Sequence, residues 1–254
     1  NLPSLNNHTW GANNEFIYAM FSRGMYQVSL CNEFLRQTSE DKLNSRSVSA
    51  ATRADIVKYR AEARFLRALS YWHLMDMFGN VPFTTENDPV GYFLPGQKDR
   101  AFMFNFIESE LNAIDADLVA SGANDFGRVD KVAAKMLLAK LYLNAQVYIN
   151  QNKFTEASNA LASVLGSTYS INVTSNYSKL FMADNDINGS QSEFIFAIRY
   201  DGVNTQTYGG TTFITHAAVG GSMNPSNFGI NGGWWGLRTR PEFVAKFGTD
   251  PRGM

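Results

Sequence analysis

The stretch "YRAEARFLRALSYWHLMDMFGNVPF", residues 59–83, carries a long helical pattern of apolar residues. In this stretch and just before it, apolar residues recur every three or four positions. They form two faces of a helix. This spacing predicts a long helix over about Ala51–Phe78 that is covered on two sides. Gly79 suits the position just after a helix end, and Pro82 prevents the helix from continuing. One face carries Ile56, Tyr59, Ala63, Leu66, Ser70, His73 and Met77, and the other carries Phe65, Leu69, Trp72 and Met75.

Similar periodicity marks helices on both sides of this stretch. A polar segment over 36–50 and a connection rich in Pro, Gly and Asp over 83–100 separate them. The last two helices form a pair in which small and large apolar residues take tetratricopeptide-like positions. The helices expected in this mainly α scaffold, which covers about 14–166, are Asn14–Arg36, Arg100–Val119, 131–149 and 153–166.

The character of the sequence changes after the scaffold. The segment "SEFIFAIRY", residues 192–200, is apolar on both alternating faces and predicts a largely buried strand. Residues 202–237 contain nine glycines and no Asp, Glu, Lys or Arg, which is typical of a long irregular functional loop. A short helix is expected within 238–248. We therefore expect one domain over 1–254, with a strand- and loop-rich region over about 167–254.

The composition of the chain excludes several classes of partner. With 254 residues, of which 44% are hydrophobic, the chain can bury a sizeable core. The net charge of −1 argues against nucleic acid as the main partner, and no apolar run reaches the length of a membrane span. The single cysteine, Cys31, lies among apolar residues and is interpreted as a buried thiol. Because the chain begins without methionine or a leader, we interpret it as a piece of a longer protein.

The sequence contains no motif for catalysis or for a metal site. His8, His73 and His216 are far apart and share no ligand spacing, and the zinc, phosphate-loop, nucleophile and dinucleotide signatures do not occur. His73 is interpreted as a hydrogen-bonded histidine of the core or its boundary. We therefore assign no catalytic residue, no metal and no cofactor.

The carboxylates are interpreted as structural. Glu62 has three arginines around it on the long helix, which predicts a charge network within that helix. A pair of carboxylates that meets only in the fold, as in a glycosidase, stays an open alternative. Two pairs lie two positions apart on one helix, so that they diverge and are expected on a solvated face. These pairs are Glu108 with Glu110 and Asp115 with Asp117, and the arginines are Arg60, Arg64 and Arg67.

The quoted stretch resembles the central signature of the SusD/RagB family, surface lipoproteins of Bacteroidota that capture nutrients, mostly glycans. Its A-E-A-R-F-L-R-A run, its aromatic pair and its F-G-x-V-P ending all follow the family pattern. Family members are typically longer, and this chain resembles their N-terminal and middle part without the lipid-bearing cysteine. Further matches in family order are "MYQVSLCNEFL", "RVDKVAAKMLLAKLYLNA", "SEFIFAIRY" and "GWWGLRTRPEFVAKF".

The resemblance implies a mainly α fold of tetratricopeptide-like helix pairs, an α-α superhelix, with long irregular loops and small strand elements. It implies a lipid-anchored protein of the outer-membrane cell surface, with the anchor outside this chain. Such a protein binds an oligosaccharide or another nutrient without catalysis and delivers it to a SusC-like TonB-dependent transporter. The signature marks the scaffold, so Arg64 and Arg67 are not assigned to ligand contact.

Ligand contacts in the family come from variable loops, where aromatic rings stack on sugars and amides bond to hydroxyls. One such loop precedes the first long helix and a second is rich in glycine. Packing onto the core is the alternative for each aromatic residue. If the second loop is extended at its tryptophan pair, one indole faces sugar and the other seals the core. The predicted ligand-binding residues are Trp10, Asn13 and Asn14, and Tyr208, Trp234 and Trp235.

Two functions of other classes remain as alternatives. One is a glycoside hydrolase, and the other is a tetratricopeptide scaffold that binds peptides in its helical groove. The sequence does not name the glycan, and it leaves open that peptide is the nutrient.

Overall fold

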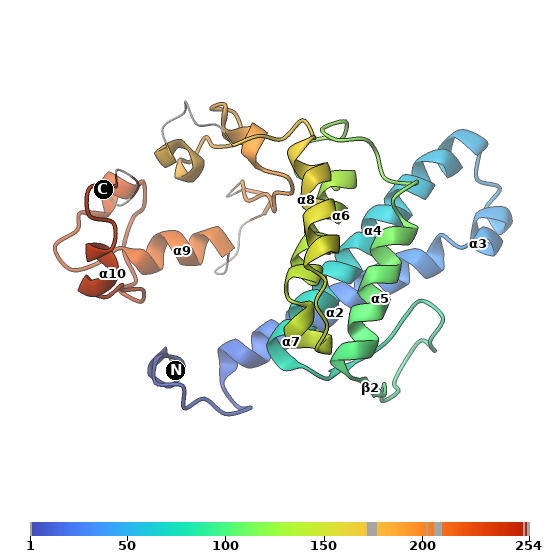
Figure 1. The fold of residues 1–254 in the computed structure, drawn as a ribbon, viewed down its shortest axis with the longest axis horizontal. Coiled ribbons are helices and arrows are strands. Elements are labelled where there is room, and N and C mark those ends of the chain that lie inside the picture. The colour runs from blue at the N-terminus through green and yellow to red at the C-terminus, as the bar shows by residue number, and fades with distance from the viewer. Residues whose placement is uncertain (1, 172–176, 202, 206–209, 251, 253–254) are drawn as a thin grey trace. The chain divides into compact units, whose positions relative to one another are not determined.

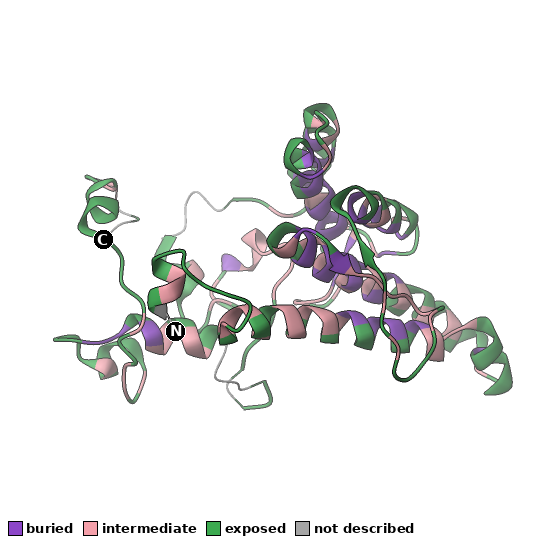
Figure 2. Ribbon diagram, turned by 90° about the horizontal axis from the view of Figure 1, so that it is seen from below, coloured by how far each residue is buried: buried purple, intermediate pink, exposed green. Residues whose placement is uncertain are grey.

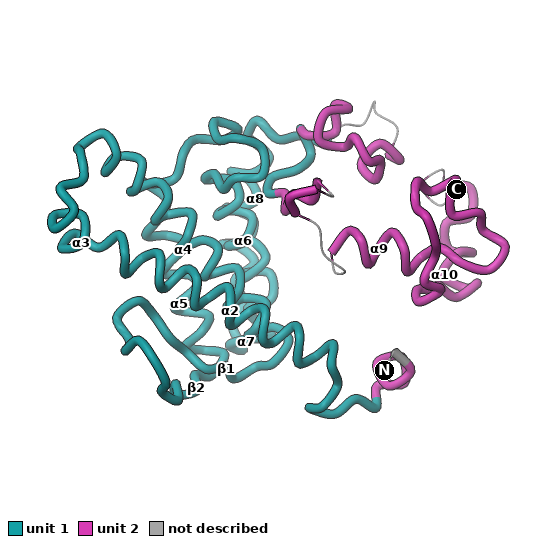
Figure 3. Tube along the Cα trace, turned by 180° about the vertical axis from the view of Figure 1, so that it is seen from behind, with its two compact units in different colours: residues 1, 9–172, 192–196 teal, residues 2–8, 173–191, 197–254 magenta. Residues whose placement is uncertain are grey.

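The computed structural model describes residues 2–171, 177–201, 203–205, 210–250 and 252. Contacts divide the chain into two compact units, which Figure 3 colours separately. The helical unit holds Thr9–Asn172 and Ser192–Phe196, and the loop-rich unit holds Leu2–His8, Val173–Gln191 and Ala197–Met254. The expectation that both units belong to one domain stays a prediction.

The long helix expected from the quoted stretch is α4, Ala50–Phe78. It begins where the Ser49 hydroxyl accepts a hydrogen bond from the backbone N–H of Thr52 at 3.2 Å, as an N-cap residue does. It ends at Gly79, whose φ of +77° suits glycine and whose N–H donates to the Met75 carbonyl at 3.0 Å. The predicted start and stop are therefore confirmed.

The predicted faces of α4 are only partly correct. Figure 1 shows α4 between α2 (Glu15–Gln37) and α5 (Arg100–Ala113), and it contacts both. Because it is covered on two sides, its middle is buried almost all round, including Tyr71 and Leu74, which neither predicted face contained. His73 and Met77, expected on the main apolar face, are exposed instead.

Helix α2 confirms the first predicted helix. Its buried residues include Val28 and Leu35, at the predicted positions. Cys31 is buried as a free thiol, and burial raises its pKa. The polar segment that follows is not entirely loop, because it contains the short helix α3, Glu40–Ser45.

The connection after α4 holds the one sheet of the described residues. Strands β1 (Val81–Pro82) and β2 (Gln97–Lys98) pair antiparallel, with Val81 opposite Lys98. The next helix, α5, ends at Ala113, earlier than the expected Val119, and turns continue the chain beyond it.

The first helix of the predicted pair is divided at Asn144 into α6 (Lys131–Leu143) and the short α7 (Ala145–Ile149), and the second helix is α8 (Phe154–Leu165). Helices α6 and α8 lie side by side, and small residues such as Ala157 and Ala160 are buried between them. Asp130 starts α6 by accepting from the N–H groups of Val132 at 2.9 Å and Ala133 at 3.1 Å. The mainly helical, tetratricopeptide-like fold class is confirmed.

The charge network within α4 that the sequence suggested is wrong. Glu62 pairs with Arg128, which is outside α4, with an Nη2–Oε1 distance of 2.6 Å. Arg60 donates to the Leu35 carbonyl at 2.6 Å and to the Thr38 hydroxyl at 2.8 Å. Glu62 and Arg60 therefore connect α4 to other segments of the chain and not to each other.

Glu110 was expected on a solvated face and is instead buried, with 9% of its surface exposed. It accepts hydrogen bonds from Arg64 Nη2 and from Arg67 Nη2, both at 2.8 Å. Burial opposes its ionisation, but the bonds from the two arginines outweigh burial and hold the pKa of Glu110 below its usual range. Arg67, which is 2% exposed, also contacts Glu86 and the amide oxygen of Asn32.

Two of the other carboxylates expected on the solvated face also have partners, whereas Asp117 is exposed as expected. Glu108 lies 3.3 Å from Lys153, and Asp115 lies 2.7 Å from Lys135. Both pairs connect α5 or its end to the α6–α8 region and are partly exposed. Spacing placed Glu108 correctly on α5, but Asp115 lies in the turns after the end of that helix, and spacing did not reveal the basic partner of either residue.

The strand expected over 192–200 is wrong. The segment begins with the 3-10 helix η2, Ser190–Glu193, and continues without regular structure. Phe196 packs edge-on against Phe65 of α4, with ring centroids 5.5 Å apart. Its apolar residues therefore cover a helix, which needs no neighbouring strand.

The glycine-rich segment contains a helix that was not predicted, α9, Gly210–Ala218. A short helix was correctly expected near the end of the chain and is α10, Pro241–Ala245. Buried residues gather in the helices of the helical unit, as Figure 2 shows. The remaining short helices are α1 (Leu2–Asn6), η1 (Tyr177–Phe181) and η3 (Pro225–Phe228).

Candidate functional site

The loop before α2 holds three of the predicted ligand-binding residues. Trp10 is 48% exposed and Asn13 is exposed, so both reach the surface of the helical unit. Asn14 has a structural task, because its amide oxygen accepts from the backbone N–H groups of Phe16 at 3.0 Å and Ile17 at 3.3 Å. This is an N-cap of α2. A role in ligand binding stays a prediction for all three residues.

The tryptophan pair lies in the loop-rich unit, at the C-terminal end of α9. The last carbonyls of a helix have no partner within the helix and need donors from elsewhere. Here the backbone of residues 234–237 supplies them. The bonds run from Trp234 N to His216 O at 2.8 Å, from Trp235 N to Val219 O at 3.2 Å, and from Gly236 N and Leu237 N to Ala217 O at 2.9 and 2.8 Å.

Two glycines allow this close approach. A Cβ on Gly233 would overlap the carbonyl oxygen of Val219. A Cβ on Gly220 would lie 2.6 Å from the indole of Trp235, closer than real Cβ contacts. These glycines therefore let the tryptophan segment pack onto the end of α9.

Trp234 packs against side chains of α9. Its ring lies 4.9 Å from the His216 imidazole at an interplanar angle of 32°, and 6.3 Å from the Phe213 ring at 62°. It is nevertheless 43% exposed. The helix thus supports the indole while leaving a large part of its surface free for contact.

Trp235 is 64% exposed, and its backbone has a φ of +59°. This is the left-handed region, which a bulky side chain rarely adopts. The premise that the pair is extended is therefore wrong, and alternation does not decide where the two indoles point. Both rings are partly exposed, and Trp235 lies against Gly220.

The predicted site residues fall into two groups in different units. Trp10, Asn13 and Asn14 belong to the helical unit, while Trp234 and Trp235 belong to the loop-rich unit. Tyr208 lies outside the described residues. His216 and Phe213 were not predicted as site residues because α9 was not recognised: glycine and threonine, which begin it, are weak helix formers. Their spacing of three residues was the available signal.

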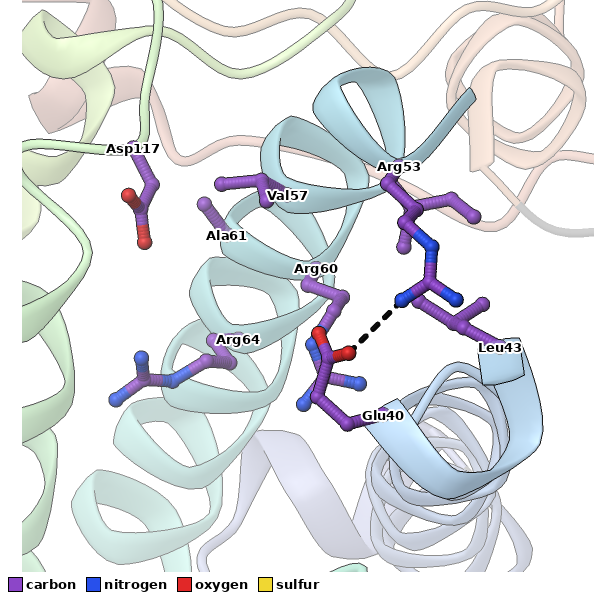
Figure 4. Close-up of a pocket in the computed structure, with 9 residues that line it drawn as sticks. Glu40, Leu43, Arg53, Val57, Arg60, Ala61, Arg64 and Asp117 are labelled. Carbon is purple, nitrogen blue, oxygen red and sulfur yellow. Dashed lines mark hydrogen bonds and ion pairs between the residues drawn. The ribbon is translucent and has the colours of Figure 1, made fainter. Parts of the chain in front are cut away.

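A pocket of about 170 Å³ lies in the helical unit between α3 and α4 (Figure 4). It has a polar wall, but its arginines already have partners. Arg53 donates to Glu40 at 2.9 Å, which is the dashed line in Figure 4. Arg64 is paired with Glu110. The pocket is therefore interpreted as part of the scaffold that joins α3 to α4.

A second hollow of about 400 Å³ is mainly apolar and lies between α4 and α6, next to residues 193–196. Trp72 and His73 line it, with ring centroids 4.7 Å apart, and Lys140 Nζ lies 5.6 Å from the Trp72 ring centre. Burial lowers the pKa of His73. His73 lines the hollow but is exposed, and its side chain makes no hydrogen bond among the described residues, so the hydrogen-bonded core or boundary position expected for it is not confirmed.

The described residues contain no group of three His, Cys, Asp or Glu side chains that could hold a metal ion. The most deeply buried glutamate among them, Glu110, is paired with two arginines that hold its pKa below the usual range, which does not suit a proton donor. None of the described helices is long and apolar enough to cross a membrane.

No family model matches the chain. The starch-binding protein SusD of Bacteroides thetaiotaomicron is 37% identical over 249 residues, which cover 97% of this chain and 42% of that protein. A SusD-like protein of Formosa agariphila is 30% identical over 74% of this chain and 32% of its own length. The chain thus spans less than half the length of these curated relatives.

Solved structures show the same fold. A SusD-like carbohydrate-binding protein of Bacteroides fragilis superposes with a TM-score of 0.54 at 26% identity, over 68% of this chain and 31% of its own. The surface glycan-binding protein A of Bacteroides uniformis gives a TM-score of 0.72 over 97% of this chain and 50% of its own. At 21% identity, the second likeness shows the fold alone. With sequence identity to SusD along nearly its whole length and this shared fold, the chain belongs to the SusD family.

Proposed function

We propose that this protein binds an oligosaccharide at the bacterial cell surface, without catalysis, and delivers it to a SusC-like TonB-dependent transporter. The protein is held at the outer membrane by a lipid anchor outside this chain. The observation that carries the proposal is the 37% identity to a starch-binding protein over 97% of the chain. Because that relative is named as a starch-binding protein, starch is the first glycan to test.

The loop-rich unit supports the proposal with suitable chemistry. Trp234 and Trp235 present partly exposed indoles on a backbone that is fastened to the end of α9. Indole rings can stack on the apolar C–H faces of a sugar ring. A support that is already ordered lowers the entropy lost on binding. Trp10 and Asn13 form the second proposed group, on the helical unit.

The proposal is tested by affinity electrophoresis and calorimetry of the full-length protein with soluble starch, laminarin and a xylogluco-oligosaccharide. The variants are Trp10→Ala, Trp234→Ala and Trp235→Ala. The matched control is Tyr18→Ala, which removes an aromatic ring that is 67% exposed on α2. We expect the wild type and the control to bind at least one glycan equally, and the tryptophan variants to bind it more weakly.

Three results would contradict parts of the proposal. Failure of the wild type to bind any glycan would remove the function. Binding that survives all three tryptophan substitutions would remove the proposed residues but not the function. Release of shorter sugars from the bound glycan, abolished by a carboxylate substitution, would identify a hydrolase instead.

The peptide-binding scaffold is tested in the same series. Peptide binding that survives Trp10→Ala and Trp234→Ala, in a protein that binds no glycan, would favour it. Delivery is tested separately, by co-purification of the full-length protein with the SusC-like transporter from outer membranes. Absence of the transporter from that material would contradict the proposed partnership.

A further inference from the structure

Gly220 is the point at which two exposed side chains of the loop-rich unit meet. A Cβ built on Gly220 would lie 2.6 Å from the Cγ and Cδ1 atoms of Trp235 and 2.9 Å from Nη2 of Arg238. Both side chains therefore pack against the backbone of Gly220, where a side chain is absent. Gly220 itself is buried beneath them.

The backbone of Trp235 is held in an unusual conformation. Its φ of +59° lies in the left-handed region, which is unfavourable for a residue with a Cβ. Such a conformation persists only where the surroundings determine it. Here the hydrogen bond from Trp235 N to Val219 O and the close approach at Gly233 do so. The ring is nevertheless left 64% exposed, so burial of the indole does not explain the unusual backbone conformation.

Arg238 adds hydrogen-bond donors beside this ring. Its Nη1 donates to the Leu237 carbonyl at 3.0 Å, which folds the guanidinium back over the segment. Among the described residues, no carboxylate lies within ion-pair distance of Arg238, and the side chain is exposed. A guanidinium carries five N–H donors in a rigid fork, so donors remain for a ligand.

We infer that Trp235 and Arg238 form one preformed sugar subsite, with Gly220 as its positioning residue. The inference rests on the proposed function and adds Arg238 and Gly220 to it. The ligand is an uncharged pyranose: its C–H face stacks on the indole, and two neighbouring hydroxyl oxygens accept hydrogen bonds from the guanidinium. The absence of Asp, Glu, Lys and Arg from residues 202–237 suits an uncharged ligand.

The test uses the full-length protein and calorimetric titration with maltoheptaose, a laminari-oligosaccharide and a xylogluco-oligosaccharide. Polygalacturonate serves as the anionic comparison. Each variant is also characterised by its melting temperature and its tryptophan emission spectrum. These readouts separate a displaced or lost indole from a protein that has lost its fold.

Four variants resolve the roles. Trp235→Ala and Arg238→Met should each weaken binding about tenfold, since stacking and charge-assisted hydrogen bonds are lost. Gly220→Ala should weaken binding by a similar factor, of roughly tenfold, and shift the emission spectrum, because the new methyl displaces the ring. Gly232→Ala is the matched control: a Cβ there meets nothing within 4 Å, and we expect binding within about twofold of wild type.

The double variant Trp235→Ala with Arg238→Met tests whether the two residues act as one subsite. We expect it to bind hardly more weakly than Trp235→Ala alone, because coupled contacts are not additive. If the wild type and the variants Trp235→Ala and Arg238→Met bound a neutral oligosaccharide equally, this inference would be overturned and the proposed function would stay intact. If the wild type bound only polygalacturonate, the proposal that the ligand is uncharged would be wrong. A wild type that binds none of the four glycans would overturn the function itself.

Discussion

The middle of α4 and the tryptophan segment of the loop-rich unit use side chains in opposite ways. In α4, Arg67 is 2% exposed, and its two terminal guanidinium nitrogens bond to Glu110, Glu86 and Asn32. In the tryptophan segment, Trp235 is 64% exposed although it is among the most apolar residues of the chain. A charge is buried in one region and an indole is exposed in the other.

The difference shows which contacts hold each region together. The helical unit depends on a large core and on buried charges that are satisfied by several helices. The tryptophan segment depends on backbone hydrogen bonds to the end of α9 and on glycines that permit them. A substitution in the first region should therefore change stability, whereas an exposed ring in the second can be replaced with little loss of fold.

The largest effect is expected for Glu110→Ala. It removes the carboxylate that bonds both Arg64 and Arg67 and leaves a buried charge partly unpaired. Breaking such a pair costs about 3–5 kcal/mol. Urea unfolding of the full-length protein should show this loss of stability. A loss below about 1 kcal/mol would mean that Glu86 and Asn32 satisfy Arg67 without Glu110.

Low pH should destabilise the ion pairs of Glu110 with Arg64 and Arg67, by less than the substitution Glu110→Ala does. The pKa of Glu110 lies below its usual value in the folded protein, so the stability it contributes is present above that usual value and is lost as the pH falls through the lowered pKa. Unfolding curves at about pH 7, 4 and 3 should show a smaller loss in Glu110→Gln than in wild type. Parallel loss in both proteins would assign the acid sensitivity to other groups.

Asn14→Ala should lower stability by about 1 kcal/mol, because it removes the cap of α2. Asn14→Ser keeps an oxygen that can cap and should restore most of the loss. Thermal unfolding measures both variants, and glycan titration distinguishes capping from ligand contact. If Asn14→Ser is stable but binds more weakly than wild type, the amide also contacts the ligand.

The smallest effect is expected at an exposed ion pair of the loop-rich unit. Arg240 and Glu242 lie 3.3 Å apart, and their side chains are 86% and 71% exposed. Arg240→Ala should leave the melting temperature of the full-length protein unchanged within error, because solvent screens exposed pairs. A clear fall in melting temperature would show that charge, and not only backbone bonding, stabilises this region.

The helices of the scaffold could be predicted because their signals are local. The apolar spacing of α4 and its stop at Gly79 lie within a few residues of the structure they determine. The same holds for the pairing of α6 with α8, where alanines repeat at helical intervals. The family signature reinforced these predictions over the same residues.

The errors come from contacts between distant segments. The partners of Arg67 lie on α2, on α5 and in the connection after α4, so no spacing on α4 could identify them. The segment 192–200 alternates like a strand but covers a helix through Phe196. The support of Trp235 by Gly220 likewise depends on contact between segments that are separated in the sequence, with Gly220 against Trp235 and Gly233 against Val219.

Trp235 is proposed to belong to a glycan-binding surface. The most direct measurement is affinity electrophoresis of the full-length protein in gels with and without soluble starch, comparing wild type with Trp235→Ala. We predict that starch retards the wild type strongly and the variant weakly, at equal melting temperatures. Equal retardation of both proteins by starch would contradict the claim.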